Sequence, residues 1–527
     1  MRHARLIALL VIMLSLAALT SSVGAQSQPK DVVQEYIANL IHEEWAAAEG
    51  MWHHDDLRRS ERLGMIYLGA PLKIDCVSPL IPLLNGVRSG DVMFGYGEVT
   101  VSDSVAVVPI RIRAGVDAIE HRYHLLQTSE GWKLISPLTA YARSWDHRDT
   151  RYARVFYADS SLLNDHALAE LDRFVERIAG LLEIFDDDLR HLQNLKLEYY
   201  LCNEEQIKQI TGYAVHGMTS LPMDAIVTRH LPHYHELVHV LTNYRLRQVP
   251  LHTLPIVQEG LAVALGGRWE KSADVLLQFG AFMLEQNLVN LDSVLTGDGF
   301  QLSAGSLDLS YAAGGLLARW LITSYGAAKF LHLYQRLSTP DTELNEWDAG
   351  HIQHEISRMY QMPWWKIVAA VGEFAAANGH GRLHPGAEIP SGDPVVSLPA
   401  NGTHVNVWES GDAYVFEINA ASDHPNVAIL FRDKSEPVST TYESRMFARH
   451  LPDVPYDQSR LGLIVTNAEA GLYDYYTNNL IEKYVLSFDP SDEYWDAGAK
   501  RIRLRLEKGA LPGALAEYEL SVRAIRP

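Results

Sequence analysis

The chain has 527 residues, 47% of them hydrophobic, and a formal net charge of −20 at pH 7. The excess of acidic over basic residues, 65 against 45, argues against nucleic acid or anionic lipid as a partner. With only two cysteines the fold is no disulfide scaffold and must rest on apolar cores, and this length allows about three domains.

Residues 1–25 have the layout of a secretory signal. Arg2 and Arg5 precede an apolar run over 6–19, and small residues lead to a cleavage site after Ala25. The run is short for a bilayer span of about 20 residues, which favours cleavage over the alternative, an uncleaved anchor. We therefore expect an extracytoplasmic protein, secreted or periplasmic, with no stable membrane span after signal cleavage.

Residues 28–140 form the first predicted domain, of α+β class, because helices precede a run of strands. The hydrophobic spacing predicts helices over 32–49 and 55–63 and strands over 92–101, 105–113, 119–128 and 132–135. Residues 123–136 resemble the last hairpin of NTF2-like cone-shaped domains, which implies that fold for the domain.

Two sets of residues leave alternatives open. The run His53-His54-Asp55-Asp56 could be taken for a metal site, but adjacent histidines point apart on a helix and a turn is expected here, so a solvated loop is favoured. In an exported chain Cys76 and Cys202 could form a disulfide, and two buried free thiols are the equal alternative.

Residues 145–385 are predicted to be mainly helical with a small sheet, and they contain His235, Glu236 and His239 in the spacing HExxH. Residues four apart lie on one face of a helix, so both imidazoles can converge on one ion. Glu236 then lies beside the ion, where it can remove a proton from a water molecule. Pro232 is well placed to open this helix. The motif indicates hydrolytic chemistry.

A catalytic zinc site needs a third protein ligand, and Glu259 is the candidate. Pro255 can open a second helix and Gly266-Gly267 can close it, which leaves Glu259 as the only acidic residue in an otherwise apolar element. A lone carboxylate there is costly unless something pairs it. The alternative is a glutamate that is merely hydrogen-bonded.

The HELVH motif followed by Gln258-Glu259-Gly260 resembles the gluzincin metallopeptidases of the peptidase MA-like group. The resemblance implies His235, His239 and Glu259 as zinc ligands and Glu236 as general base. It also implies that the strand before the zinc helix, here residues 224–228, is an edge strand that holds the substrate backbone.

Residues 310–321 resemble the Tyr-x-x-Gly helix start of the aminopeptidase branch of that group. The resemblance implies that the Tyr311 hydroxyl stabilises the oxyanion, and the alternative is a tyrosine packed at a helix start. Gly217-Met218-Thr219 only faintly resembles the motif by which aminopeptidases capture a free amino terminus, so aminopeptidase activity is not expected. Where thermolysin-like enzymes bond an aspartate to a zinc-bound histidine, this chain has Val263, so that hydrogen bond must come from elsewhere.

Residues 395–527 change to short alternating runs, which predict a β-sandwich in which no catalytic cluster is evident. The expected strands are 404–408, 413–418, 427–431, 463–466, 483–488, 501–506 and 517–522. The fold class predicted for the whole chain is multidomain: an α+β N-terminal domain, a mainly helical zincin-like catalytic domain with a small sheet, and a C-terminal β-sandwich.

The predicted function is an exported zinc metallopeptidase. We expect it to bind one Zn²⁺ per chain and to hydrolyse a peptide or protein substrate by zinc-activated water, with Glu236 as general base. The alternative is a non-catalytic extracytoplasmic binding or assembly protein built on a zincin scaffold. The sequence predicts no oligomeric state.

Overall fold

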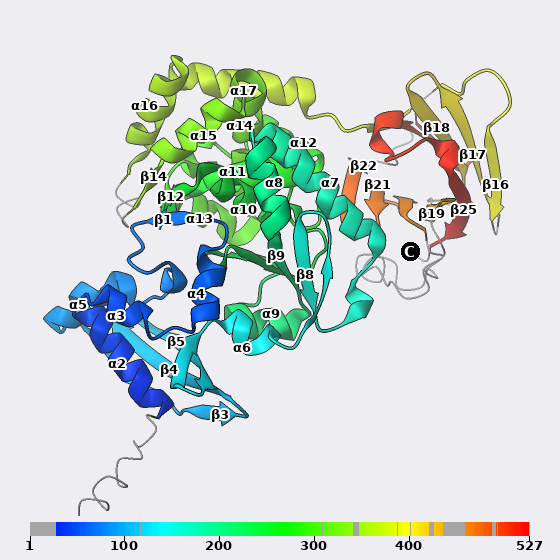
Figure 1. The fold of residues 1–527 in the computed structure, drawn as a ribbon. Coiled ribbons are helices and arrows are strands. Elements are labelled where there is room, and N and C mark those ends of the chain that lie inside the picture. Colours follow the sequence, from blue (N-terminus) through cyan, green and yellow to red (C-terminus); the bar gives the residue numbers. More distant parts are fainter. Residues whose placement is uncertain are drawn as a thin grey trace, which may run out of the picture. The chain divides into compact units, whose positions relative to one another are not determined.

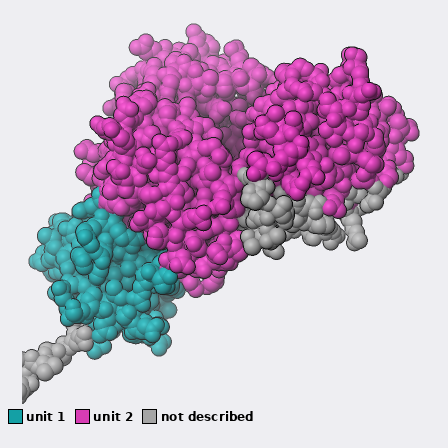
Figure 2. Space-filling view, turned by 45° about the vertical axis from the view of Figure 1, so that its right-hand side comes forward, with its two compact units in different colours: residues 1–61, 71–144 teal, residues 62–70, 145–527 magenta. Residues whose placement is uncertain are grey.

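The computed structural model describes residues 28–115, 117–307, 309–340, 347–386, 388–400, 402–420, 426–435, 459–486, 488, 492 and 494–525. The predicted signal, residues 1–25, lies outside them. The chain divides into two compact units, Met1–Glu61 with Pro71–Ser144, and Arg62–Ala70 with Trp145–Pro527 (Figure 2). A multidomain chain that combines helices with several sheets is thus confirmed. Of the helices in the described part of the chain, none is both long and apolar enough to cross a membrane.

The first unit is built on a five-stranded antiparallel sheet with the order β2-β4-β5-β6 and with β3 paired to β4. Its strands are β2 (Val92–Tyr96), β3 (Thr100–Ser102), β4 (Val105–Ala114), β5 (Asp117–Thr128) and β6 (Gly131–Ile135). Its α-helices are α2 (Pro29–Ile41), α3 (Trp45–Glu49), α4 (His54–Glu61), α5 (Leu84–Ser89) and α6 (Pro137–Ala142). Val33, Tyr36, Ile37 and Leu40 recur at helical spacing and are almost completely buried, so one face of α2 packs on this sheet (Figure 1).

Two predictions for this unit are wrong. The helix expected over 32–49 is two helices, because Glu43 has a φ of 59°, in the left-handed region that a right-handed helix does not contain. The loop expected at His53 to Asp56 is instead largely the first turn of α4, in which His54 and Asp55 are exposed as expected. The His53 and His54 rings do not point apart, because their centroids lie 4.6 Å from each other. The buried Asp56 carboxylate accepts a 2.6 Å hydrogen bond from the backbone N–H of Ser136, the N-cap of α6, so it serves as an internal anchor.

The second unit contains a five-stranded sheet with the order β10-β11-β9-β8-β7. These strands are β7 (Asp146–Asp149), β8 (Ala153–Tyr157), β9 (Leu197–Leu201), β10 (Gly217–Ser220) and β11 (Ala225–Thr228). β8, β9 and β11 run parallel, and β10 lies antiparallel to β11 at the edge. The expectation that residues 224–228 form the edge strand is therefore wrong, because a short hairpin adds β10 outside β11.

Helices pack around this sheet and form one apolar core with it. They are α7 (Asp165–Leu181), α8 (Asp186–Leu195), α9 (Glu204–Thr211), α10 (Tyr234–Leu246), α11 (Pro255–Gly266), α12 (Ala273–Glu285), α13 (Gly297–Leu307), α14 (Leu309–Tyr325), α15 (Ala327–Arg336), α16 (Ala349–Tyr360) and α17 (Trp364–Asn378). The two helices α11 and α14 cross at Gly260 and Gly314. A Cβ at Gly260 would lie 2.7 Å from the Gly314 carbonyl oxygen, so only glycine permits this approach.

Segment Arg62–Ala70 belongs to the second unit although its neighbours in sequence belong to the first. Its strand β1 (Ile66–Leu68) pairs in parallel with β12 (Gln248–Pro250), which follows α10. Leu63 and Met65 are buried in the core of the second unit, and the Tyr67 hydroxyl donates a 3.0 Å hydrogen bond to Asp224 Oδ1. This segment therefore helps to hold the end of α10.

The C-terminal part of the second unit consists of two mainly antiparallel sheets that enclose a common apolar core. The outer sheet has the order β15-β24-β18-β17-β16 with β23 on β24, and the inner sheet has the order β22-β21-β20-β19-β25. Their strands are β15 (Leu383–Pro385), β16 (Val396–Ala400), β17 (Thr403–Ser410), β18 (Ala413–Asn419), β19 (Val427–Asp433), β20 (Leu461–Val465), β21 (Glu469–Asp474), β22 (Asn479–Val485), β23 (Trp495–Asp496), β24 (Arg501–Glu507) and β25 (Tyr518–Ala524).

The inner sheet is buried on both faces. Ile429 of β19 faces the common core, whereas the next residue, Leu430, packs in a second cluster with Val275 of α12. Consecutive residues of this strand, which face opposite sides of the sheet, are thus both apolar, as in strands covered on two sides.

Cys76 and Cys202 are both buried free thiols, which is the second of the two alternatives left open by the sequence.

Candidate metal centre

The helix α10 carries the HExxH motif, and His233 caps its start. The His233 Nδ1 accepts the backbone N–H of Glu236 at 3.3 Å, which satisfies a donor that the first helical turn leaves open. Burial, with smaller effects of His230 and His235, holds the pKa of His233 well below its usual range, so the ring is neutral and can accept. The expectation that Pro232 opens the helix is wrong, because the cap is an imidazole and α10 begins only at Tyr234.

Three donor atoms converge from α10 and α11. The His235 Nε2 lies 3.0 Å from Glu259 Oε2 and 3.2 Å from His239 Nε2, and His239 Nε2 lies 3.7 Å from Glu259 Oε2. Tetrahedral zinc with ligands at about 2.0–2.1 Å sets neighbouring donors about 3.3–3.4 Å apart. The observed separations bracket that value, so the three donor atoms are spaced as zinc requires. Pro255 at the first position of α11 and Gly267 at its end confirm the predicted helix that presents Glu259.

Electrostatics keep Glu259 in the ionised form that a metal ligand needs, while the same pairing favours the protonated form of His239. Burial alone would raise the pKa of Glu259, but the His239 and His235 imidazoles outweigh it and hold this pKa well below its usual range. Burial likewise lowers the pKa of His239, and the Glu259 carboxylate overcomes it and raises this pKa. Glu259 is therefore an ionised, partly buried carboxylate whose charge is balanced by its neighbours.

The orienting hydrogen bond for His235 comes from the backbone. Its Nδ1 lies 2.9 Å from the carbonyl oxygen of Gly267, so the Nδ1–H can donate there and leave Nε2 as the lone-pair atom toward Glu259 and His239. Gly267 has a φ of 73°, and a side chain there would collide with the Lys271 carbonyl. The second glycine of the helix end thus supplies the contact that Val263 does not.

Glu236 is held by the edge strand. The Thr219 hydroxyl of β10 donates a 2.7 Å hydrogen bond to Glu236 Oε2, which fixes one carboxylate oxygen and leaves Oε1 for proton transfer. No sequence pattern indicates this role of Thr219, although it lies in the segment Gly217-Met218-Thr219 with the faint motif resemblance. In the same strand, a Cβ at Gly217 would collide with the His233 ring, so glycine is required there.

Arg268 is a second residue that the sequence analysis missed. Its Nη1 lies 3.1 Å from His235 Nε2 and 3.3 Å from Glu259 Oε2, and its guanidinium carbon lies 3.6 Å from the ring centroid of Tyr311. The only sequence signal is its place, directly after the glycine pair that ends α11. Tyr311 is near the start of α14 as expected, with its ring against Arg268, Trp269 and Phe300. The oxyanion role of its hydroxyl stays a prediction.

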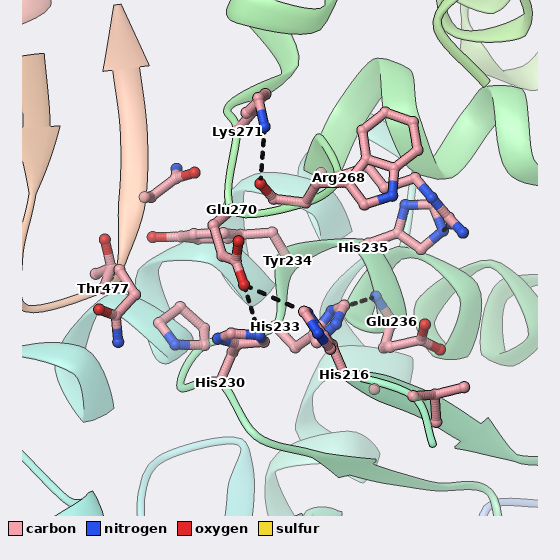
Figure 3. A pocket seen from close by; sticks show the side chains of 17 residues that line it. His216, His230, His233, Tyr234, His235, Glu236, Arg268, Glu270, Lys271 and Thr477 are labelled. Carbon is pink, nitrogen blue, oxygen red and sulfur yellow. Dashed lines mark hydrogen bonds and ion pairs between the residues drawn. The ribbon is translucent and has the colours of Figure 1, made fainter. Parts of the chain in front are cut away.

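A pocket of about 290 Å³ opens beside Glu236 (Figure 3). Histidines 216, 230 and 233 line it from the side of the sheet, and Arg268 lines it from the side of α11. Thr477 and Asn478, between β21 and β22, and Asn479 at the start of β22 form a further wall. The C-terminal sheets therefore contribute to the pocket, although their sequence shows no catalytic cluster.

No protein-family model matches this chain, and no curated protein matches it. The interpretation of the site therefore depends on its donor atoms and their geometry.

Proposed function

We propose that the protein is an exported zinc-dependent metallopeptidase of gluzincin type. The observation that carries this proposal is the convergence of His235 Nε2, His239 Nε2 and Glu259 Oε2 at 3.0–3.7 Å, with Glu236 on the same helix. Three protein ligands are typical of catalytic zinc, whereas structural zinc takes four. Within this proposal, residues 28–140 are an NTF2-like domain, 145–385 the gluzincin-like domain and 395–527 a β-sandwich.

Zinc, when bound, supplies a Lewis acid that polarises the scissile carbonyl and acidifies a water molecule. Glu236 accepts a proton from the attacking water at Oε1, while Thr219 holds Oε2, and it then passes that proton to the leaving amide nitrogen. β10 is the edge strand of its sheet within the described residues, and an extended peptide could pair along this edge beside α10. Tyr311 or Arg268 donates to the developing oxyanion.

The test combines metal content with chelator-sensitive proteolysis of a generic protein substrate. Mature wild-type protein should hold zinc at this site, and His235→Ala, His239→Ala and Glu259→Ala should each lower occupancy. Glu236→Gln should keep zinc but lose hydrolysis by about 10² to 10⁴, because glutamine has the same shape and takes no proton near neutral pH. Tyr311→Phe should lose about 10² to 10³, as expected for one oxyanion donor.

Glu285→Gln, at the exposed end of α12, is the matched control and should behave as wild type. Equal hydrolysis by wild type and Glu236→Gln would refute the proposal. Unchanged hydrolysis by Tyr311→Phe would remove only the role of Tyr311.

One contact favours the second candidate, a non-catalytic binding or assembly protein on a zincin scaffold. The Arg268 guanidinium hydrogen-bonds Glu259 and lies within 3.1 Å of His235 Nε2, so a positive charge competes for the donors that a metal needs. In a scaffold protein this arginine would replace the metal. Both Glu236→Gln and Tyr311→Phe would then match wild type in binding and stability, with no hydrolysis in any of the three proteins.

A further inference from the structure

A second cluster of metal-binding side chains lies in the same pocket, apart from the first. Glu270 Oε1 lies 3.4 Å from His216 Nδ1 and 3.2 Å from His230 Nε2, and the three ligand atoms lie within 4.8 Å of one another. Figure 3 shows the Glu270 carboxylate pointing at both imidazoles. The two distances from Glu270 Oε1 to the imidazole nitrogens match the spacing of about 3.3–3.4 Å that tetrahedral zinc imposes on its donors.

The three residues come from the segments that build the rest of the site. His216 directly precedes β10, His230 lies between β11 and α10, and Glu270 follows α11. An ion held here would therefore tie together the edge strand, the start of the HExxH helix and the end of the helix that carries Glu259.

The backbone at Glu270 is strained and firmly held. Trp269 and Glu270 have φ values of 51° and 56°, a left-handed conformation that large side chains rarely adopt. The Leu480 N–H of β22 donates to the Glu270 carbonyl at 2.7 Å, and the Ser272 N–H donates to the Leu480 carbonyl at 3.0 Å. Strain that the surrounding structure maintains is typical of functional sites. Here it places the carboxylate between two imidazoles.

The donor types and the exposure of the cluster also suit a cation. The His216 side chain is 51% exposed, so a bound ion would keep an open side toward the pocket. Two imidazoles and one carboxylate form the same donor set as His235, His239 and Glu259.

We propose that His216, His230 and Glu270 bind a second divalent ion of the zinc type. The two sites share no ligand. The His233 ring lies between them, with its centroid 5.6 Å from that of His230 and 6.5 Å from that of His235. The second ion is thus separate from the first and does not form the two-metal pair, about 3.5–4 Å apart, of binuclear hydrolases. The proposal does not depend on hydrolysis.

The proposal is tested by measuring the metal stoichiometry of the full-length mature protein. The protein is first loaded with Zn²⁺ and then freed of unbound Zn²⁺. Wild type should hold two equivalents. Glu270→Gln and His216→Ala should each hold one equivalent, at the first site. Glu259→Gln should hold one equivalent, at the second site. The double variant with Glu259→Gln and Glu270→Gln should hold none. His354→Ala, an exposed histidine on α16, is the control and should hold two. Circular dichroism verifies folding, and His216 is exposed enough for its removal to be tolerated.

A second readout uses stability. Zinc should raise the thermal midpoint of Glu259→Gln, in which only the second site remains, and should not raise that of the double variant. A wild type with a single equivalent that Glu259→Gln removes would overturn this proposal and leave the peptidase proposal standing. Two equivalents in both Glu270→Gln and His216→Ala would overturn it as well, and would show a hydrogen-bonded cluster without an ion.

Discussion

At the scale of single residues, Arg268 decides how tightly the proposed centre can hold a cation. A unit charge about 4 Å from another contributes about 4 kcal/mol at an effective dielectric constant of about 20, and about 1.4 kcal/mol already changes affinity tenfold. We expect Arg268→Ala to bind zinc at least about tenfold more tightly, measured by competition with a chromophoric chelator. In a peptidase it should also slow hydrolysis by about 10² to 10³, because an oxyanion donor is lost.

The Arg268→Ala variant distinguishes the two candidate functions. A scaffold protein would gain metal affinity and have no rate to lose. Arg190→Ala, which removes an exposed arginine paired with Asp187, is the control and should change neither quantity. Unchanged zinc affinity in Arg268→Ala would show that the guanidinium does not compete for the ligands.

Asp75 of the first unit makes a prediction about pH. It is buried, and the Tyr36 and Tyr123 hydroxyls donate to its Oδ2 at 2.8 and 3.2 Å. Burial raises the pKa of Asp75 to about 7 despite these hydrogen bonds. The folded unit therefore keeps the proton between about pH 4 and pH 7 whereas the unfolded chain loses it, so stability falls as the pH rises through this window. The loss is of the order of 1.4 kcal/mol per pH unit.

Asp75→Asn should remove this dependence and be more stable than wild type at pH 8. Hydrogen exchange of the β4 and β5 amides, corrected for intrinsic rates and compared at pH 5 and pH 8, measures it in the full chain. Glu49→Gln, at an exposed position of α3, should retain the wild-type dependence. If Asp75→Asn loses as much protection between pH 5 and pH 8 as wild type does, the pH dependence of stability belongs to another group.

At the scale of elements, the sequence predicts what is local. The ligand residues lie on helices whose period, proline start and glycine end can be read directly, and α11 confirms that reading for Glu259. Thr219, Arg268 and Glu270 were not predictable, because each reaches the site through a hairpin or loop whose partners are distant in sequence. Sheet order is likewise non-local: residues 224–228 read as a strand, but nothing in them shows that β10 covers their edge.

Segment Arg62–Ala70 yields a prediction at the same scale. A truncated protein that begins at Trp145 keeps every proposed ligand of the first metal site and should bind zinc there, but it lacks the buried side chains of Leu63, Met65 and Tyr67. Since loss of a single buried leucine side chain typically costs about 2–5 kcal/mol, we expect a clearly lowered thermal midpoint. A synthetic peptide of residues 62–70 should raise that midpoint, and a scrambled peptide of the same composition should not. A truncated protein that folds yet binds no zinc would show that the missing residues contribute to the site.

At the scale of the whole second unit, a buried charge joins the C-terminal sheets to the helices that carry the site. The Glu482 carboxylate of β22 is fully buried. It accepts hydrogen bonds from Arg382 Nε at 2.6 Å, the Arg382 backbone N–H at 3.0 Å and Gln278 Nε2 of α12 at 3.2 Å. The same strand begins next to Leu480, whose backbone holds the loop of Arg268 and Glu270. Packing of the inner sheet and geometry of the site are thus linked through β22.

Glu482→Ala should therefore destabilise the second unit and loosen the site together. Removal of the Glu482 carboxylate leaves Gln278 Nε2 and the Arg382 backbone N–H without this acceptor, whereas the partly exposed Arg382 guanidinium keeps its pairing with Asp274, so we expect a cost of about 1–3 kcal/mol. We expect a lower unfolding midpoint in urea and faster hydrogen exchange of the Ser272 and Leu480 amides, which hold the loop after α11. Glu409→Ala, which removes an exposed glutamate paired with Lys508, should change stability by no more than about 1 kcal/mol. If Glu482→Ala lowers the midpoint but leaves exchange at Ser272 and Leu480 unchanged, the inner sheet stabilises the unit without controlling the loop, and the position of Arg268 and Glu270 must depend on α11 alone.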